Sequence, residues 1–385
     1  MRVYLKNNGY AISEKFPMTF FEIEDVLDKL KQMESVVHFE ISEHDNMELP
    51  MSICGKEFSA DIYRLNLFAE RLENLNISEI TAFKSLLIAN PESSFEDMLL
   101  MTYGLDFVMI YPCQDCCELG KTVIENEMMP ELEGYSAEIL QLLDPEKVGI
   151  LMQNQEGGVF IDEHYCVTSG YEPPDINIEI GRPESCFFRL LVAPDSEKRE
   201  QAHWVTLPFD EEKHLYLSEM KCLEFQSSLP GITKKSFNKV LEMRVLNKFS
   251  ERLSELSHNN FVKLKAVMEA ENIHDISHCI ECAEHLDEYQ FDQSVQDYNE
   301  FGIAYLSRNL PTNFDISALE NIDLFDFGQG ILSYNHGEVT SYGAISGRGQ
   351  EQYSALTVQP EQQLDEDIVE DIKEDFDMEM GGMSL

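Results

Sequence analysis

The feature that most constrains the fold of this chain is an internal repeat. The segment LNLFAERLENL at 65–75 recurs as LNKFSERLSEL at 246–256. Two unrelated amphipathic helices would share only the helical spacing of their apolar residues. Here the agreement also includes residues outside that spacing. ELG at 118–120 matches EFG at 300–302, and the distance along the chain between them is nearly the same as between the two repeated helices. The chain is therefore predicted to contain two related copies in tandem.

The repeat and the local composition together predict four segments. We expect a first copy at 1–170, a linker at 171–184 that contains the Pro and Gly typical of linkers, a second copy at 185–345, and a tail at 346–385. The tail is acidic and has few core-forming residues after Val358, so we expect it to be either disordered or a lone helix.

Within each copy the pattern of apolar residues is typical of an α+β fold. Short runs rich in β-branched and aromatic residues predict strands at 1–5, 36–41, 106–111, 157–161, 187–193 and 202–207. Leu65, Phe68 and Leu72 follow helical spacing and form one apolar stripe, which leaves acidic side chains on the other face of the helix. Ser93-x-x-Glu96 has the spacing of a capping box, which predicts that another helix begins there.

The second constraint is charge. The 385 residues carry 28 Lys and Arg side chains against 72 Asp and Glu, a formal net charge of −44. Apolar residues make up 43% of the chain, as in ordinary globular proteins, so the acidity does not indicate a disordered chain. Binding to a nucleic-acid backbone or to an anionic membrane depends on Lys and Arg. Direct binding to either is therefore not expected.

The negative charge extends along the whole chain. The net charge is −20 for residues 1–170, −15 for 171–345 and −9 for 346–385. Duplex DNA carries about one charge per 1.7 Å of its axis, so 44 charges correspond to about 75 Å of duplex. We therefore expect an elongated molecule whose acidic helix faces place carboxylates where DNA has phosphates. The alternative is a generic solvated acidic surface without a partner.

The lack of visible targeting signals and the cysteine usage favour a cytoplasmic location. The N-terminal residues lack the apolar stretch of a secretory signal, and no membrane span is visible. Nine cysteines without an export signal indicate reduced thiols more than a disulfide framework.

Two CxxC pairs have the spacing of zinc ligands: Cys113 with Cys116, and Cys279 with Cys282. His274 and His278 are further candidate ligands near the second pair. The pairs do not occupy equivalent positions of the repeat, and Cys279 falls on an apolar helical stripe, so ordinary burial is the competing interpretation. No P-loop, GxGxxG, GxSxG or HExxH motif occurs, and we expect neither an enzyme nor a cofactor.

Several segments resemble the ArdA-type antirestriction proteins of conjugative and mobile genetic elements. AHWVTLPFDEEK at 202–213 is similar to the family's early pattern of an aromatic strand, Leu-Pro and acidic residues leading into a helix. The two repeated helices resemble its central helix. The ELG or EFG turn and GGVFI at 157–161 resemble the segments after that helix. Each copy has about the length of one such protein.

This resemblance implies a curved protein of small α+β subdomains that mimics B-form DNA and blocks the DNA-binding groove of type I restriction-modification enzymes. Family members act as dimers, so two copies in one chain imply an intramolecular pseudo-dimer, with further dimerisation left open. The first copy departs from the family's pattern, because KFPMTFFEIED at 15–25 lacks the Trp that is present in AHWVTLPFDEEK. No single residue inherits a named role.

The predicted function is therefore a non-enzymatic anti-defence inhibitor that binds a DNA-binding defence protein. A CRISPR effector, whose guide–target channel is also positively charged, is an alternative target. A different class of function is a zinc-stabilised interaction module or a metal-dependent enzyme that uses the CxxC pairs. The candidate phosphate mimics are Glu70, Glu73, Glu92, Glu96, Asp97, Glu118, Glu125, Glu131, Glu133 and Glu138 in the first copy, and Glu251, Glu255, Glu281, Glu284, Asp287, Glu288, Asp292, Asp297 and Glu300 in the second.

One basic segment stands out in this acidic chain. Residues 234–248 contain Lys234, Lys235, Lys239, Arg244 and Lys248. We expect either that the acidic tail or a partner docks on this segment, or that it is a solvated helix face.

Overall fold

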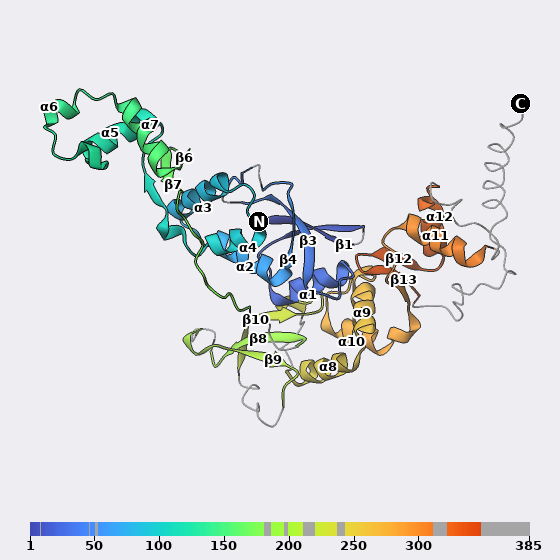
Figure 1. The fold of residues 1–385 in the computed structure, drawn as a ribbon. Coiled ribbons are helices and arrows are strands. Elements are labelled where there is room, and N and C mark those ends of the chain that lie inside the picture. The colour runs from blue at the N-terminus through green and yellow to red at the C-terminus, as the bar shows by residue number, and fades with distance from the viewer. Residues whose placement is uncertain are drawn as a thin grey trace, which may run out of the picture. The chain divides into compact units, whose positions relative to one another are not determined.

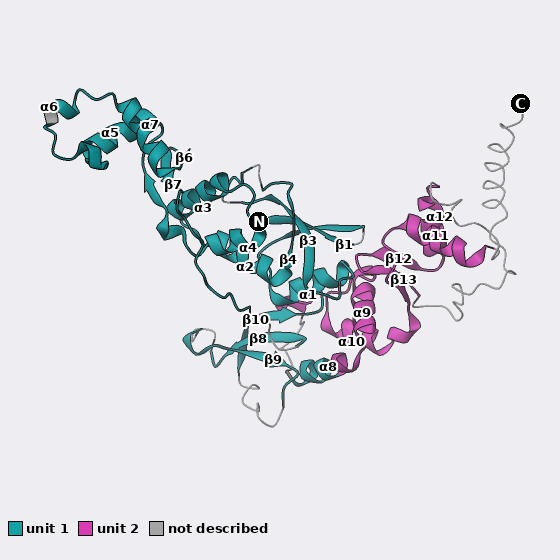
Figure 2. Ribbon diagram, viewed as in Figure 1, with its two compact units in different colours: residues 1–229, 242–251 teal, residues 230–241, 252–385 magenta. Residues whose placement is uncertain are grey.

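The computed structural model describes residues 1–347 apart from 8, 46, 51–52, 181–185, 196–198, 211–219, 237–242 and 311–321. It has a mixed α+β fold, as the sequence predicts (Figure 1). The chain divides into two compact units, residues 1–229 with 242–251 and residues 230–241 with 252–385 (Figure 2). This division does not coincide with the predicted limits at 170 and 185. The predicted tail lies almost entirely outside the described residues.

Unit 1 begins with a four-stranded antiparallel sheet of order β2-β1-β3-β4. Its strands are β1 (Arg2–Asn7), β2 (Tyr10–Lys15), β3 (Val36–Glu43) and β4 (Glu57–Asp61). Burial alternates along β1, where Val3 and Leu5 are buried and Arg2 and Tyr4 are exposed, as expected for a sheet with one face covered.

Four helices supply the other side of this core: α1 (Phe20–Lys29), α2 (Ile62–Glu73), α3 (Ile77–Ala89) and α4 (Phe95–Met101). The apolar stripe predicted for α2 is buried, since Leu65, Phe68 and Leu72 are each at most 2% exposed. Phe95 makes edge-to-face contacts with Phe39 and Phe68, with ring centroids 5.2 and 5.3 Å apart. The stripe therefore packs as helical periodicity requires.

The predicted linker is partly packed against this core. Residues 171–180 contain neither helix nor strand, yet Tyr171, Ile178 and Ile180 lie against the buried cluster of unit 1. Arg64 also donates a hydrogen bond from Nη2 to the carbonyl of Ile178 at 3.3 Å. Residues 181–184 lie outside the described part of the chain.

The next part of unit 1 is a small module with its own core. Its elements are β5 (Met109–Tyr111), α5 (Cys116–Glu125), η2 (Pro130–Leu132), α6 (Ala137–Leu140), α7 (Pro145–Glu156), β6 (Gly158–Ile161) and β7 (His164–Val167). They follow the turn η1 (Leu105–Phe107), whose buried residue Leu105 belongs to the first core. The strands form a sheet of order β5-β7-β6. Residues 105–107 form a 3-10 turn, so the strand predicted to begin at 106 begins only at Met109.

A three-stranded sheet of order β10-β8-β9 then follows in unit 1. It is built from β8 (Phe188–Ala193), β9 (His203–Leu207) and β10 (Lys221–Ser227), with the short turn η3 (Arg199–Gln201) before β9. Both β8 and β9 lie where the sequence predicts strands.

The boundary between the units falls inside α8 (Met243–Glu255). Unit 2 contains η5 (Lys234–Ser236), α9 (His258–Ala270), α10 (Ile276–Glu284), η6 (Leu286–Glu288), β11 (Gln290–Asp292), α11 (Tyr298–Asn309), α12 (Phe325–Tyr334), β12 (Gly337–Thr340) and β13 (Gly343–Ser346). Its strands form a sheet of order β11-β13-β12. No helix in the described ranges combines the length and the apolar character needed to cross a membrane.

The order of elements is the same in two parts of the chain. Residues 62–111 form α2, α3, α4, η1 and β5, and residues 243–292 form α8, α9, α10, η6 and β11. Each element of the first set is paired with the element at the same place in the second set. The first residues of the two elements are separated by the same number of residues in all five pairs, and the repeated sequences at 65–75 and 246–256 have this separation too. The two small sheets that follow also share a strand order, with the third strand along the chain in the centre of each.

Two asparagines make equivalent hydrogen bonds on α2 and α8. The side chain of Asn66 accepts from the backbone N–H of Met18 at 2.6 Å and donates to the Met18 carbonyl at 3.1 Å. Asn247 does the same with Phe209, at 2.8 and 3.1 Å. Each asparagine therefore satisfies both backbone groups of a residue that follows a strand, which holds that residue against the helix.

The start of α4 corrects the predicted capping box by one residue. Ser94, not Ser93, is the N-cap, and its partner at the third helical position is Asp97, not Glu96. The Ser94 hydroxyl accepts from the Asp97 N–H at 3.1 Å, and the Asp97 carboxylate accepts from the Ser94 N–H at 3.0 Å. Aspartate is short, so the sequence pattern of the box, which requires Glu or Gln, missed it.

Replacing Ser94 by alanine is therefore expected to lower the free energy of unfolding by about 1 kcal/mol, the usual cost of losing an N-cap. Ser93→Ala is the matched control, because the Ser93 hydroxyl donates only to the Asn90 carbonyl and should cost less than about 0.5 kcal/mol. Urea denaturation followed by circular dichroism measures both, and equal losses would contradict the assignment of the cap.

Candidate functional site

The predicted phosphate mimics are mostly on the surface. Of the 19 carboxylates, 16 are exposed and three, Asp97, Glu118 and Asp292, are half-buried. The exposed carboxylates lie on helices and turns of both units. They are therefore accessible to a partner.

The three half-buried carboxylates stabilise local structure. Asp97 belongs to the capping box of α4, and Glu118 accepts from the backbone N–H of Gln114 at 2.9 Å. Asp292 accepts from Arg308 Nη2 at 2.7 Å. Burial acts to raise the pKa of Asp292, but hydrogen bonds from Ser294 and Arg308 outweigh it and hold the pKa below its usual value. These three carboxylates are therefore already engaged in hydrogen bonds within the fold.

Other predicted mimics have partners of their own. Glu96 pairs with Arg64, and Glu284 pairs with Arg252 at 3.2 Å. Glu300 accepts from the backbone N–H of Gln296 at 2.7 Å. Exposed ion pairs of this kind contribute little to stability. The carboxylates of Glu96 and Glu284 therefore remain available to a partner that supplies a stronger cation, whereas Glu300 is held by a backbone N–H as Glu118 is.

The segment from α5 to α7 has few cations of its own. Residues 112–157 contain ten acidic and two basic side chains, a net charge of −8. Glu125, Glu131, Glu133 and Glu138 are all exposed here. Hydrogen bonds from the Ser136 hydroxyl and from its own backbone lower the pKa of Glu138, which keeps its charge present to lower pH. Most of the negative charge in this segment is therefore not offset by basic residues of the same segment.

In the part of the chain that the structure describes, the two cysteines of each CxxC pair contact different groups. The Cys113 sulfur lies 3.4 Å from the Thr122 hydroxyl, whereas Cys116 donates to the Gln153 side chain at 3.5 Å. Cys279 donates to the Met268 sulfur at 3.4 Å in the core, and burial raises its pKa far above the usual value. The interpretation of Cys279 as a small buried hydrophobe therefore agrees with its surroundings.

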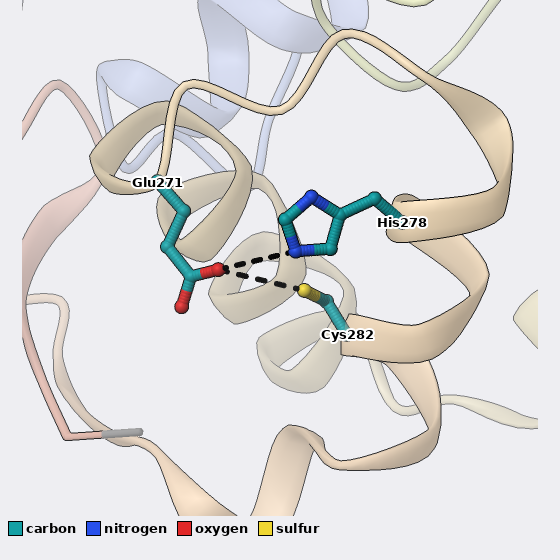
Figure 3. Close-up of side chains that lie close together, drawn as sticks. All are labelled: Glu271, His278 and Cys282. Carbon is teal, nitrogen blue, oxygen red and sulfur yellow. Dashed lines mark hydrogen bonds and ion pairs between the residues drawn. The ribbon is translucent and has the colours of Figure 1, made fainter. Parts of the chain in front are cut away.

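Cys282 faces a different environment, together with Glu271 and His278. One ligand atom from each of these three side chains lies within 4.8 Å of the other two, and no other group of this kind occurs in the described ranges. His278 Nε2 is 3.7 Å from Glu271 Oε2, and Cys282 Sγ is 3.8 Å from the same oxygen. Figure 3 shows the carboxylate of Glu271 facing the imidazole and the thiol. Atoms of these types at this separation can bind a metal ion.

Tyr289 completes this cluster. Its hydroxyl donates a hydrogen bond to Oε1 of Glu271. Burial, and then the hydrogen bond with Glu271, raise the pKa of Tyr289 well above its usual value, so the phenol stays protonated and remains a donor.

The sequence prediction identified part of the cluster and missed the rest. Cys282 and His278 were candidates because of the CxxC spacing and a nearby His. Glu271 and Tyr289 carried no signal, because Glu271 lies at the end of α9 and Tyr289 lies between η6 and β11, so only the tertiary fold brings them near α10. His274, the other candidate, instead makes a 2.9 Å hydrogen bond with the Asn272 side chain.

The basic segment at 234–248 is described only in part. Lys234 and Lys235 lie in η5, and Arg244 and Lys248 lie in α8, whereas 237–242 lie outside the described residues. The prediction that the tail docks here lies outside them as well.

No protein-family model matches the chain, and no curated protein matches it either.

Proposed function

We propose that this chain is an ArdA-type DNA mimic that occupies the DNA-binding groove of a bacterial defence nuclease, with a type I restriction-modification enzyme as the favoured target. The observation that carries the proposal is the exposure of 16 of the 19 predicted mimic carboxylates in a chain of net charge −44. A negative surface of this kind attracts a basic DNA groove at a high rate and then blocks it. Such an inhibitor would act in the cytoplasm and would need no catalytic group.

We further propose that the chain contains two ArdA-like copies that form an elongated, curved pseudo-dimer with acidic helix faces. The common offset between five pairs of elements supports the duplication. The matching hydrogen bonds of Asn66 and Asn247 support it independently, because they join each helix to a residue distant in sequence.

The test is binding of the full chain to a purified type I restriction-modification complex. We expect duplex DNA to compete with the chain, because both would occupy the same groove. Binding should also weaken steeply with salt, by about 10³-fold between about 50 and 200 mM if some six ion pairs form. Binding that is insensitive to both DNA and salt would contradict the mimic.

A CRISPR effector remains the alternative target, since its channel is also basic. Repeating the experiment with a purified effector separates the two targets. Binding to the effector alone would retain the mimic and change its target.

A further inference from the structure

The cluster of Glu271, His278 and Cys282 is built by the meeting of two helices in unit 2. His278 and Cys282 lie four residues apart on α10, so both side chains project from the same face. Glu271 is the C-cap residue of α9, and its carboxylate faces that pair (Figure 3). The three groups therefore converge although they come from two separate helices.

The two distances from Glu271 are close to those between the ligand atoms of a tetrahedral metal ion. Zinc bonds of about 2.0–2.3 Å to nitrogen, oxygen and sulfur place neighbouring ligand atoms about 3.3–3.7 Å apart. The observed distances from Glu271 Oε2 are 3.7 Å to His278 Nε2 and 3.8 Å to Cys282 Sγ. The ligand atoms of His278 and Cys282 lie within 4.8 Å of each other, so metal binding would draw these two side chains together.

We propose that Glu271, His278 and Cys282 bind a divalent transition-metal ion, with zinc preferred. Binding replaces the thiol proton of Cys282, which is released to solvent as the zinc–sulfur bond forms. One thiolate and one carboxylate then balance the two positive charges of the ion, and the neutral imidazole supplies the third ligand. A thiolate and an imidazole select against magnesium and calcium, which require oxygen ligands.

Tyr289 supports this site from outside the ligand set. Its hydroxyl donates to Oε1 of Glu271, which leaves Oε2 directed at His278 and Cys282. Hydrogen bonds of this kind orient a ligating carboxylate, and their loss typically lowers metal affinity about 10- to 100-fold.

The site has a buried side and an open side. Cys282 is 0% exposed, whereas the side chains of His278 and Glu271 are 41% and 29% exposed. A fourth ligand can therefore reach the ion from solvent, as water or as a group from a partner. The ion would join the end of α9 to α10.

The first half of the chain provides an internal comparison. The equivalent positions of the repeat are Asn90, Asp97 and Met101. Asp97 is occupied by the capping box of α4, and Met101 has no thiolate to offer. The equivalent positions therefore cannot form the same site, and the proposed metal site belongs to the second half of the chain.

Cobalt(II) is the probe, because its bond to a thiolate produces a charge-transfer absorption. We expect the full chain to bind Co²⁺ with this band and to release Co²⁺ when Zn²⁺ is added. Cys282→Ala should abolish the band. Cys279→Ala is the matched control, since it removes a second buried thiol from the same helix and should leave the band intact.

His278→Ala provides a second variant in case Cys282→Ala disturbs packing, because the His278 side chain reaches the surface. It should weaken Co²⁺ binding more than about 10-fold, and Tyr289→Phe should weaken it about 10- to 100-fold. Circular dichroism checks that each variant is folded. A band that persists in folded Cys282→Ala, an affinity unchanged in His278→Ala, or no Co²⁺ uptake by the unmodified chain would overturn the proposal.

Discussion

Replacing Glu125, Glu131, Glu133 and Glu138 together by glutamine is expected to weaken binding to the target nuclease by roughly 5- to 1,000-fold. All four side chains are exposed on the segment that carries ten acidic and two basic residues. Each exposed ion pair contributes about 0.2–1 kcal/mol, so the four together contribute about 1–4 kcal/mol. Each single replacement should change affinity by less than about fivefold, because many weak contacts share the binding.

The control for this variant is a second set of four exposed carboxylates outside the predicted surface. Glu34, Glu48, Glu57 and Glu163 are also exposed, and replacing them by glutamine changes the net charge by the same amount. Titration of the nuclease by surface plasmon resonance compares the two sets. If the control set weakens binding equally, bulk charge is responsible and the predicted surface is wrong. If neither set does, the mimic proposal fails.

Replacing Gly328 by alanine is expected to destabilise the packing of α11 against α12 by about 1–3 kcal/mol. A Cβ atom on Gly328 would lie 1.8 Å from the carbonyl oxygen of Tyr298, which is backbone and cannot rotate away. The helices would have to move apart, and overpacking of this kind costs about that much. Hydrogen exchange of the α11 and α12 amides measures the change locally.

Gly330 is the matched control in the same helix. A Cβ atom there would meet nothing within 4 Å, so Gly330→Ala should stabilise α12 by about 0.5–1 kcal/mol through helix propensity. Destabilisation by both substitutions, or by neither, would contradict the close approach of the two helices.

The same kind of contact occurs between α5 and α7 in unit 1. A Cβ atom on Gly149 would lie 1.8 Å from the Cys116 carbonyl oxygen, and one on Gly120 would lie 1.7 Å from that of Pro145. The sequence marked Gly120 and Gly302 as matching positions but did not give the reason for them. The reason is that helix backbones approach closely where these glycines lie, and a side chain would prevent it.

The predictions that agreed with the structure depend on neighbours along the chain. The buried stripe of α2 follows from a helical period of 3.6 residues, and the strands at 187–193 and 202–207 follow from β-branched and aromatic runs. The capping box of α4 was displaced by one residue, because the shorter Asp97 fills the position that the pattern reserves for Glu or Gln.

The sequence by itself determined the mixed α+β class, the excess of negative charge and the apolar faces of the helices, since composition and short-range periodicity carry that information. Only the tertiary structure decided which carboxylates are used within the fold, where Asp97, Glu118 and Asp292 are engaged. It also decided that Cys282 meets Glu271 and His278 while Cys279 faces Met268. The physical reason is that two thiols three residues apart lie on the same side of a helix but one turn apart along it, and the packing of neighbouring elements determines what each one meets.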